Sequence, residues 1–434
     1  MMKWAREQGC VWGEDTCSLA AANGHLEVLQ WAKAEGCPWD EQTCSSAAMG
    51  GYLEVLQWAR QMECPWDRKT CSYAARGGHL GVLQWARSEG CPWNAEAPTL
   101  AASGGHLELI MWAVEHECEI KPIACVEAAV LGGHLNVAQW AHQRWIKDVA
   151  KTRCKVLAIF CKGASLTRHA IRNGNLEILK WLRASGCTWK QHNSCKDALM
   201  TGHLSVLKYL RANGCRWGDR NIGNEAAKRG YLAMLKWATG DGCRVDTRTI
   251  CAEVAKGGHL EVLRWVRANL GAEWGNTASE AAFGGHLDIL KWARENGCPL
   301  TESVCSAAAR KGHFGILKWA RSVGCPWDKW TSSSAAESGH LRILRWATAQ
   351  GCPTYNLCTS AASGGHLEIL KWARKIGCTW NEGTCTAAAR GGHLEVLKWA
   401  REHGCPWDKR TVTSAGSQGF EKVWDWAKRH GCPH

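Results

Sequence analysis

Gly24-His25-Leu26-Glu27-Val28-Leu29 is the stretch that determines the fold, because close variants of it recur along the whole chain of 434 residues. The histidine of this motif, or the residue in its place, occurs at His25, Tyr52, His79, His106, His134, Asn175, His203, Tyr231, His259, His286, His313, His340, His366, His393 and Phe420. These fifteen anchor positions are 26 to 28 residues apart, except for one interval of 41 residues. A unit of this length cannot bury a core of its own, so the sequence predicts an array stabilised by contacts between neighbouring units.

Within one unit, residues 40–64, the pattern predicts a pair of helices. Small residues recur at helical spacing from Cys44 to Ala48, and Gly50-Gly51 ends that run. The apolar face of a second, amphipathic helix is formed by Leu53, Val55, Leu56, Trp58 and Ala59. Pro65 disfavours helical geometry at the residue before it, so the second helix ends there. Each unit is therefore predicted to be a helix, a glycine turn, a helix and a short loop.

Tryptophan is used with unusual regularity, with 28 Trp against 4 Phe and 5 Tyr. In nearly every unit a Trp follows the anchor position by six residues, as Trp31 and Trp58 do. Bulk on the second helix requires small residues opposite it if the interior is to reach native packing density. We therefore expect this Trp to pack against the Cys, Ser, Thr and Ala residues of the first helix.

The 25 cysteines allow three interpretations: packed thiols, disulfides or a metal site. Loop and first-helix cysteines lie seven residues apart, as Cys37 and Cys44 do, whereas structural zinc sites usually have Cys pairs two to four residues apart. The first-helix position also accepts Pro98, Ala278, Ser332 and Val412. Such replacements favour packed, reduced thiols, and we predict no metal site and no cofactor, with disulfides or zinc as the alternative.

The anchor histidine is predicted to cap or pack rather than to catalyse. It is exchanged for Tyr52, Asn175, Tyr231 and Phe420, which cannot replace a general base or a metal ligand. The chain also has no nucleophile elbow, no phosphate-binding glycine loop and no carboxylate pair outside the repeat pattern. The sequence therefore predicts a protein that is not an enzyme.

The repeat resembles the ankyrin repeat. Gly24-His25-Leu26-Glu27-Val28-Leu29 is similar to the family's Gly-His-Leu-Glu-Ile-Val, and Ala20-Ala21 to the Ala-Ala after its Thr-Pro-Leu-His. Gly271-Ala272 matches the family's usual Gly-Ala, where other units have Gly-Cys. The unit is about six residues shorter than the family's 33, and runs such as Gln42-Thr43-Cys44-Ser45 replace the Thr-Pro-Leu-His block. The missing residues fall in the family's β-hairpin finger.

This resemblance implies an all-α, ankyrin-like helical-hairpin solenoid of about 15 short repeats, with reduced or absent β-hairpin fingers. Short Trp-rich units of this kind are similar to those abundant in large DNA viruses, oomycetes and algae, where they serve as interaction arrays. The resemblance implies a non-catalytic scaffold that binds a protein partner through its concave face and its loop tips.

Two groups of residues vary between units and are the candidate contacts with a partner. The first group precedes the anchor by three residues, on the expected concave face, and includes Arg172, Lys228, Lys256, Phe283, Arg310 and Arg390. The second group lies at the expected loop tips and includes Arg68, Lys69, Arg220, Arg248, Lys329, Trp330, Lys409 and Arg410. Neutral variation on a solvated surface is the alternative explanation.

Charge divides the chain into three parts. Residues 1–145 form an acidic sub-array, with 10 Lys+Arg and 17 Asp+Glu for a net charge of −7. Residues 146–163 are a basic insert, interpreted as a hinge or an ordered helix, and residues 164–434 form a basic sub-array. The residue before the Trp changes accordingly, from Gln57 in the first part to Lys236 in the last. From residue 146 onward the net charge is +20, which gives the total of +13.

The basic excess favours an acidic protein partner, with polyanion or nucleic-acid binding by the C-terminal sub-array as the alternative. No run of about 18 apolar residues occurs, so we predict no membrane span. The opening residues lack the apolar core of a secretory signal, so we expect a cytoplasmic or nuclear protein with reduced thiols. Residues 1–10 match only the second half of a unit. Either residues precede them or another chain covers this edge; otherwise we expect a monomer.

Overall fold

The computed structural model describes residues 13–152, 164–189, 193–218 and 222–433. The chain divides into two compact units, Met1–Gly218 and Asp219–His434, here called the first and second unit. Over the described ranges the regular structure is entirely helical, with 30 α-helices and no strand. None of these helices is long and apolar enough to cross a membrane.

The helices of the first unit are α2 (Glu14–Ala22), α3 (Leu26–Ala34), α4 (Glu41–Gly50), α5 (Leu53–Gln61), α6 (Arg68–Gly77), α7 (Leu80–Ser88), α8 (Glu96–Gly104), α9 (Leu107–Glu115), α10 (Pro122–Gly132), α11 (Leu135–Thr152), α13 (Ala164–Arg172), α14 (Leu176–Ala184), α15 (Ser194–Thr201) and α16 (Leu204–Ala212). The helices of the second unit are α17 (Ile222–Lys228), α18 (Leu232–Gly240), α19 (Ile250–Gly257), α20 (Leu260–Leu270), α21 (Thr277–Gly284), α22 (Leu287–Glu295), α23 (Glu302–Lys311), α24 (Phe314–Ser322), α25 (Lys329–Glu337), α26 (Leu341–Ala349), α27 (Leu357–Ser363), α28 (Leu367–Lys375), α29 (Glu382–Arg390), α30 (Leu394–Glu402), α31 (Lys409–Ser417) and α32 (Glu421–Arg429).

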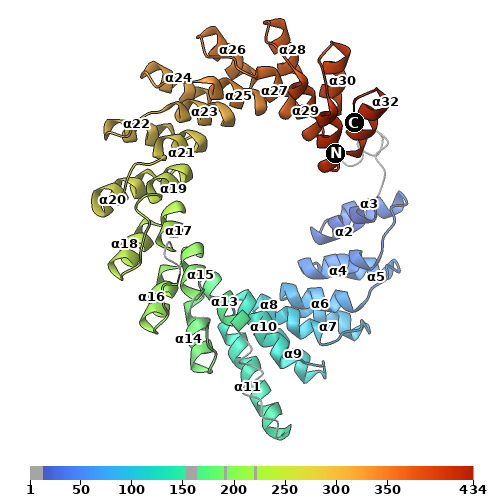
Figure 1. Cartoon of the computed structure of the whole chain (residues 1–434). Coiled ribbons are helices and arrows are strands. Elements are labelled where there is room, and N and C mark those ends of the chain that lie inside the picture. Colours follow the sequence, from blue (N-terminus) through green and yellow to red (C-terminus); the bar gives the residue numbers. More distant parts are fainter. Residues whose placement is uncertain (1–12, 153–163, 190–192, 219–221, 434) are drawn as a thin grey trace. The chain divides into compact units, whose positions relative to one another are not determined.

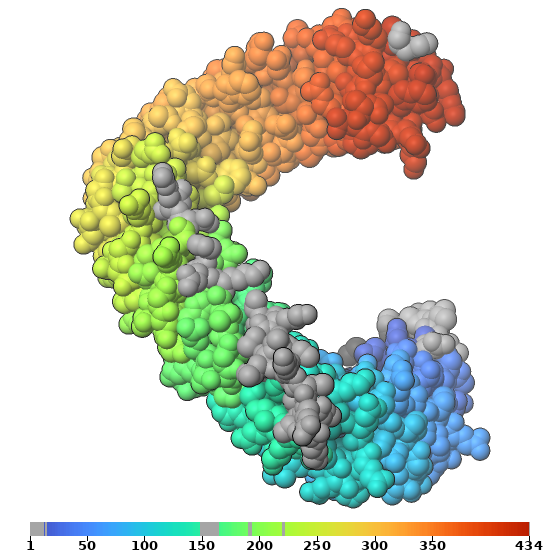
Figure 2. Space-filling model, turned by 60° about the horizontal axis from the view of Figure 1, so that its bottom comes forward, coloured from blue at the N-terminus to red at the C-terminus, as the bar shows by residue number. Residues whose placement is uncertain are grey.

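The helices form pairs, in which a first helix ends at the glycine turn and a second helix begins after the anchor residue. Within each unit, the first helices of successive pairs pack against one another. In the second unit the first helices line the inner side of a curved stack and the second helices its outer side (Figure 1). In the space-filling view the second unit curves around this inner side (Figure 2). The predicted all-α repeat solenoid is confirmed, and the described loops between pairs contain no strand.

The core lies between the two helices of each pair and between neighbouring pairs. In α5 the buried side chains are Val55, Leu56 and Ala59, which lie on one helical face. In α4, Cys44 and the alanines that follow it are fully buried. Small side chains let the first helices approach closely, and the larger aliphatic side chains of the second helices fill the outer part of each layer.

In most of the described repeats whose anchor is histidine, a hydrogen bond across neighbouring turns links the repeat to the one before it. The ring Nε2 of His106 lies 3.1 Å from the carbonyl oxygen of Arg76. The same ring covers Gly78, which has a φ of 77°, and a Cβ there would lie 2.4 Å from the ring. The predicted packing role of the anchor is thus realised between repeats. The His106 side chain does not cap the N-terminus of its own helix α9, and the carbonyl that it contacts lies in the last turn of α6.

The structure places the second-helix Trp differently from the prediction. Trp58 and Trp85 are half-buried and do not lie in the core. Their partners are the loop tryptophans: Trp66 contacts Trp85 edge-on, with ring centroids 5.9 Å apart. The guanidinium of Arg60 stacks on Trp66 at 4.2 Å from its centroid. Because aliphatic residues fill the interior, the large rings cover the layer edges instead.

Cysteines approach one another over a spacing of 20 residues. Cys195 and Cys215 Sγ atoms are 3.0 Å apart, and the thiol of Cys305 donates to Cys325 Sγ at 3.7 Å. That hydrogen bond raises the pKa of Cys305 and lowers the pKa of Cys325. Nearly all cysteines of the described ranges are buried, as Cys44, Cys195 and Cys305 are. They therefore occupy packed positions between the layers, and the absence of bound zinc and of disulfides stays a prediction.

The insert predicted at residues 146–163 begins as a continuation of a helix. α11 has 18 residues, whereas the other second helices described in the first unit have nine. It projects past its neighbours in the first unit (Figure 1). Residues 153–163 lie outside the described residues. The division by charge into residues 1–145, 146–163 and 164–434 stays a prediction.

Candidate functional site on the inner face

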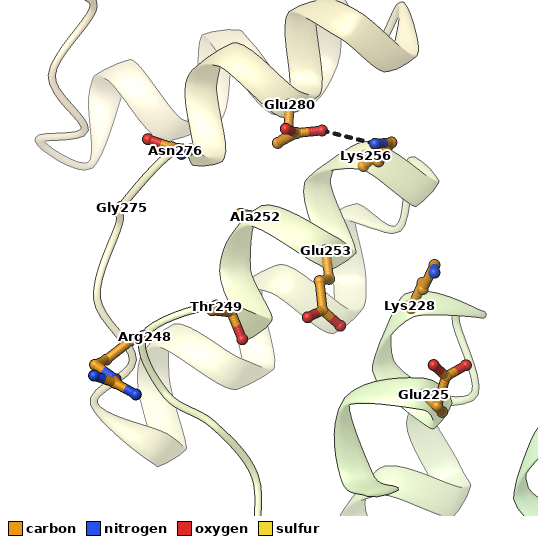
Figure 3. Close-up of a pocket in the computed structure, with 10 residues that line it drawn as sticks. All are labelled: Glu225, Lys228, Arg248, Thr249, Ala252, Glu253, Lys256, Gly275, Asn276 and Glu280. Carbon is orange, nitrogen blue, oxygen red and sulfur yellow. Dashed lines mark ion pairs between the residues drawn. The ribbon is translucent and has the colours of Figure 1, made fainter. Parts of the chain in front are cut away.

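A pocket of about 450 Å³ opens on the inner face of the second unit, between α17, α19 and α21. Figure 3 shows its ten lining residues. They are Glu225, Lys228, Arg248, Thr249, Ala252, Glu253, Lys256, Gly275, Asn276 and Glu280. Three of the residues predicted from the sequence, namely Lys228, Arg248 and Lys256, are therefore brought together.

The repeat itself positions these side chains. Lys228 and Lys256 stand three residues before their anchors, at the C-terminal ends of α17 and α19. Glu225 and Glu253 stand three residues earlier, so each helix presents a carboxylate and an amine on one exposed face. Arg248 comes from the loop before α19, at the opposite end of the pocket from Lys228 (Figure 3).

Lys256 is held by two neighbours. Its Nζ lies 3.2 Å from Glu280 Oε2 and 4.8 Å from the centroid of Phe283. The buried Oε2 atom of Glu280 accepts no hydrogen bond in the part of the chain described, because the contact with Lys256 lacks hydrogen-bond geometry. Lys311 Nζ lies 4.5 Å from the centroid of Phe283, so two amines contact one ring.

The loop end of the pocket is ordered by Asp246. Its Oδ1 accepts hydrogen bonds from the backbone N–H of Arg248 at 3.1 Å and from Arg248 Nε at 3.4 Å. The backbone hydrogen bond from Arg248, followed by the guanidinium charge, lowers the pKa of Asp246. This carboxylate therefore stays ionised and fixes the direction of the Arg248 side chain.

Charges of both signs line the pocket, with three carboxylates and three cations. Glu225 forms an ion pair with Arg229 at 3.7 Å. Lys228 and Glu253 form no ion pair with any residue that the structure describes. These two side chains are the groups most available to a ligand, one cationic and one anionic, and they come from successive repeats.

The other predicted contact residues lie elsewhere. Arg172, Arg310 and Arg390 are exposed at the equivalent position of α13, α23 and α29, outside the pocket. The predicted loop tips are mostly the first turns of first helices, and they include Arg68, Lys69, Lys329, Trp330, Lys409 and Arg410. An aspartate caps such turns, as Asp67 accepts from the backbone N–H of Lys69 at 2.8 Å. Arg220 lies outside the described residues.

Sequence reasoning missed the carboxylates of the pocket. The position six residues before the anchor is acidic in four consecutive repeats and in no others, namely at Asp197, Glu225, Glu253 and Glu280. This clustering is visible in the sequence, but only when the repeat position is compared across all units. The net positive charge of the whole chain gives no indication of this acidic cluster.

No protein-family model matches the chain. No curated protein matches it. Among solved structures, the pentatricopeptide repeat protein PPR10 from maize is 16% identical with a TM-score of 0.32, covering 98% of this chain and 79% of its own. PPR10 in complex with an 18-nt psaJ RNA element is 11% identical with a TM-score of 0.32, over 96% and 79% of the two chains. The human ASB11 ankyrin repeat domain is 16% identical with a TM-score of 0.25, over 44% and 85%. All three are repeat proteins, and the chain is itself a helical repeat protein.

Proposed function

We propose that the chain is a non-catalytic scaffold that binds a protein partner through the inner face of its second unit. The observation that carries this proposal is the pocket, where three successive repeats place charged side chains of both signs around about 450 Å³. Each repeat contributes the same positions, so a segment lying along the stack would meet a regular row of contacts. Such rows are how solenoid proteins use extended concave surfaces.

The charges of the pocket restrict which kind of partner segment could bind there. Lys228 and Arg248 could pair with acidic side chains of the partner, which the positive net charge of this chain also favours. Glu225 and Glu253 would repel a purely acidic segment, because like charges placed opposite each other at an interface are unfavourable. We therefore propose a largely acidic segment that carries at least one Lys or Arg, whose cation is placed beside Glu253.

Further contacts are proposed at the edge formed by the first turns of the first helices. Trp330 is 61% exposed and Tyr355 is 58% exposed, although large aromatic side chains are usually covered. Lys329 Nζ lies 5.6 Å from the centroid of Trp330 and 4.9 Å from that of Tyr355. We also propose that the repeats are ankyrin-like, on the strength of their Gly-His-Leu-Glu-Val-Leu motif and glycine turn.

Polyanion binding is the second candidate, and it depends on the cations that precede the Trp on the second helices. Four of these cations are neutralised by an acid three residues earlier. The pairs are Glu177–Lys180 at 2.7 Å, Glu261–Arg264 at 3.5 Å, Glu368–Lys371 at 2.8 Å and Glu395–Lys398 at 2.8 Å. The cations that precede the Trp therefore do not form a continuous row of unpaired positive charge. A protein partner is the better supported proposal.

A charge exchange tests the proposed function. Exchanging signs in Lys228→Glu/Glu253→Lys keeps the net charge while reversing the two groups most available to a ligand. The control is Glu395→Lys/Lys398→Glu, which exchanges an ion pair on α30. Affinity capture with cross-linking and quantitative mass spectrometry should recover a protein with the wild type and the control and lose it with the exchange variant. Recovery of the same proteins by all three chains would contradict the proposal.

A further inference from the structure

The outer surface of α24 and α26 differs from that of the helices on either side of it. At the position where several other repeats carry the neutralising acid, these two helices carry Gly315 and Arg342. Three cations are therefore left together here: Lys318 on α24, with Arg342 and Arg345 on α26. We call them the outer basic cluster. None of the three forms an ion pair with a carboxylate of the described residues.

An aromatic ring joins two of these cations across the repeat boundary. Phe314 stands where nearly all other repeats carry Leu, and its ring lies edge-on to Trp346 with centroids 5.4 Å apart. Lys318 Nζ is 4.4 Å and Arg342 Cζ is 5.1 Å from the centroid of Phe314. Cation–π contacts of this length restrict the two side chains and keep their charges near the same ring. The cluster is thus partly ordered before any ligand arrives.

Arg342 and Arg345 are also close neighbours. They occupy the two positions that bring Glu368 and Lys371 to within 2.8 Å of each other on α28. Two like charges at such helical positions destabilise the helix instead of supporting it. An anion bound between them would remove this repulsion, and guanidinium groups are well suited to hold one because their donors match phosphoryl oxygens in pairs.

The cluster is short, which limits the size of the anion. On its C-terminal side Lys371 and Lys398 are both paired with glutamates. On its N-terminal side α22 carries an acid at this position, because Asp288 stands three residues before Lys291, although the two side chains form no ion pair in the described residues. Between α22 and α28 the acid is thus missing from this position in two repeats. A cluster of this extent suits one phosphoryl group better than a polynucleotide that needs a row of cations.

From these observations we propose that the outer basic cluster binds a single phosphoryl group carried by a protein segment. A phosphoserine or phosphothreonine brings a charge of about −1.5 to −2 and three acceptor oxygens. Lys318, Arg342 and Arg345 supply the donors, and Phe314 holds two of them in place. This surface lies on the outer helices, so the proposal is independent of the inner-face pocket.

The probe is a short Gly/Ser peptide with one phosphoserine, titrated by calorimetry into the full chain at low and physiological salt. Arg342→Glu is the decisive variant, because it recreates the Glu–Arg arrangement of Glu261 and Arg264 and should fold at least as well as the wild type. We expect the wild type to bind the phosphopeptide and Arg342→Glu to lose affinity by roughly tenfold or more. The control Lys398→Gln removes a cation that is already paired and should bind like the wild type.

Other results would overturn the proposal. Equal binding of the phosphopeptide by the wild type and Arg342→Glu would exclude the cluster as the site. Equal binding of the unphosphorylated peptide would exclude a phosphoryl ligand. A single-stranded RNA oligonucleotide that binds more tightly than the phosphopeptide, and weakens equally with Arg342→Glu and Lys398→Gln, would assign the surface to nucleic acid.

Discussion

The imidazole Nε2 of His79 lies 3.1 Å from the backbone carbonyl oxygen of Met49, thirty residues earlier in the chain. The ring fills the space over Gly51, where a Cβ would lie 2.5 Å from it. Where the anchor is Tyr52, its ring covers Gly24 in the same way. The shared feature is therefore a flat side chain over the glycine turn of the preceding repeat, and most of the histidine anchors add a hydrogen bond to it.

The contribution of the anchor can be measured at His286, whose Nε2 lies 3.2 Å from the carbonyl oxygen of Lys256. His286→Ala removes both the hydrogen bond and the ring packing, and we expect it to lower the free energy of unfolding by about 1–3 kcal/mol. His286→Tyr should lose clearly less, because the chain itself uses Tyr52 and Tyr231 as anchors. Urea unfolding followed by circular dichroism measures both, and equal stability of His286→Ala and the wild type would refute the role given to this residue.

Substitutions at two glycines distinguish the effect of backbone strain from the effect of ring packing. Gly78 has a φ of 77° and lies under the ring of His106, whereas Gly90 has a φ of 80° and nothing within 4 Å of a built Cβ. Gly90→Ala should lose only the left-handed conformational preference, about 1 kcal/mol. Gly78→Ala should lose that plus about 1–3 kcal/mol for overpacking. Thermal unfolding of the two variants measures the difference, and identical melting temperatures would show that the ring contact is unimportant.

The cation stacked on each loop Trp should contribute to stability. Arg60 stacks on Trp66 and donates from Nη1 to the carbonyl oxygen of Cys64. We expect Arg60→Ala to lower the free energy of unfolding by about 1–2 kcal/mol, since it removes one hydrogen bond and one cation–π contact. Arg60→Lys should lose less than half of that, because Lys33 takes the same place over Trp39 at 4.1 Å. Equal losses for Ala and Lys in chemical denaturation would contradict the cation–π assignment.

Burial of thiols predicts a loss of stability in alkaline solution. Burial raises the pKa of Cys251 from 9.0 to about 11. Above pH 9 the unfolded thiol loses its proton while the folded thiol keeps it, so the folded state binds more protons and stability falls between pH 9 and 11. Cys251→Ala should reduce this fall, and alanine already stands at the equivalent position at Ala278. Urea unfolding midpoints measured at neutral pH and between pH 9 and 11 test this prediction. If the midpoint falls with pH as steeply in Cys251→Ala as in the wild type, the Cys251 thiol is not the cause.

The secondary structure and its repetition could be predicted from local signals. The 27-residue period, the small residues from Cys44 to Ala48 and the break at Gly50-Gly51 all act within a few residues. Helical periodicity and glycine turns are encoded at this range, so both helices of each pair were expected at the right places. Lys228 and Lys256 are also predictable as candidate contacts, because both stand at one repeat position whose residue type varies between repeats.

Which side chains meet depends on how the repeats stack. Stacking brings Cys305 to Cys325 and His79 to Met49, and it moves the tryptophans from the expected core to the layer edges. It also places Glu253 beside Lys228 in one pocket. The order of the helices and turns is predictable from the sequence, because helix and turn preferences depend on neighbours along the chain. The contacts between repeats depend on the angle and offset at which one layer packs on the next, and residues 20 to 30 positions apart acquire a spatial relationship only through that packing.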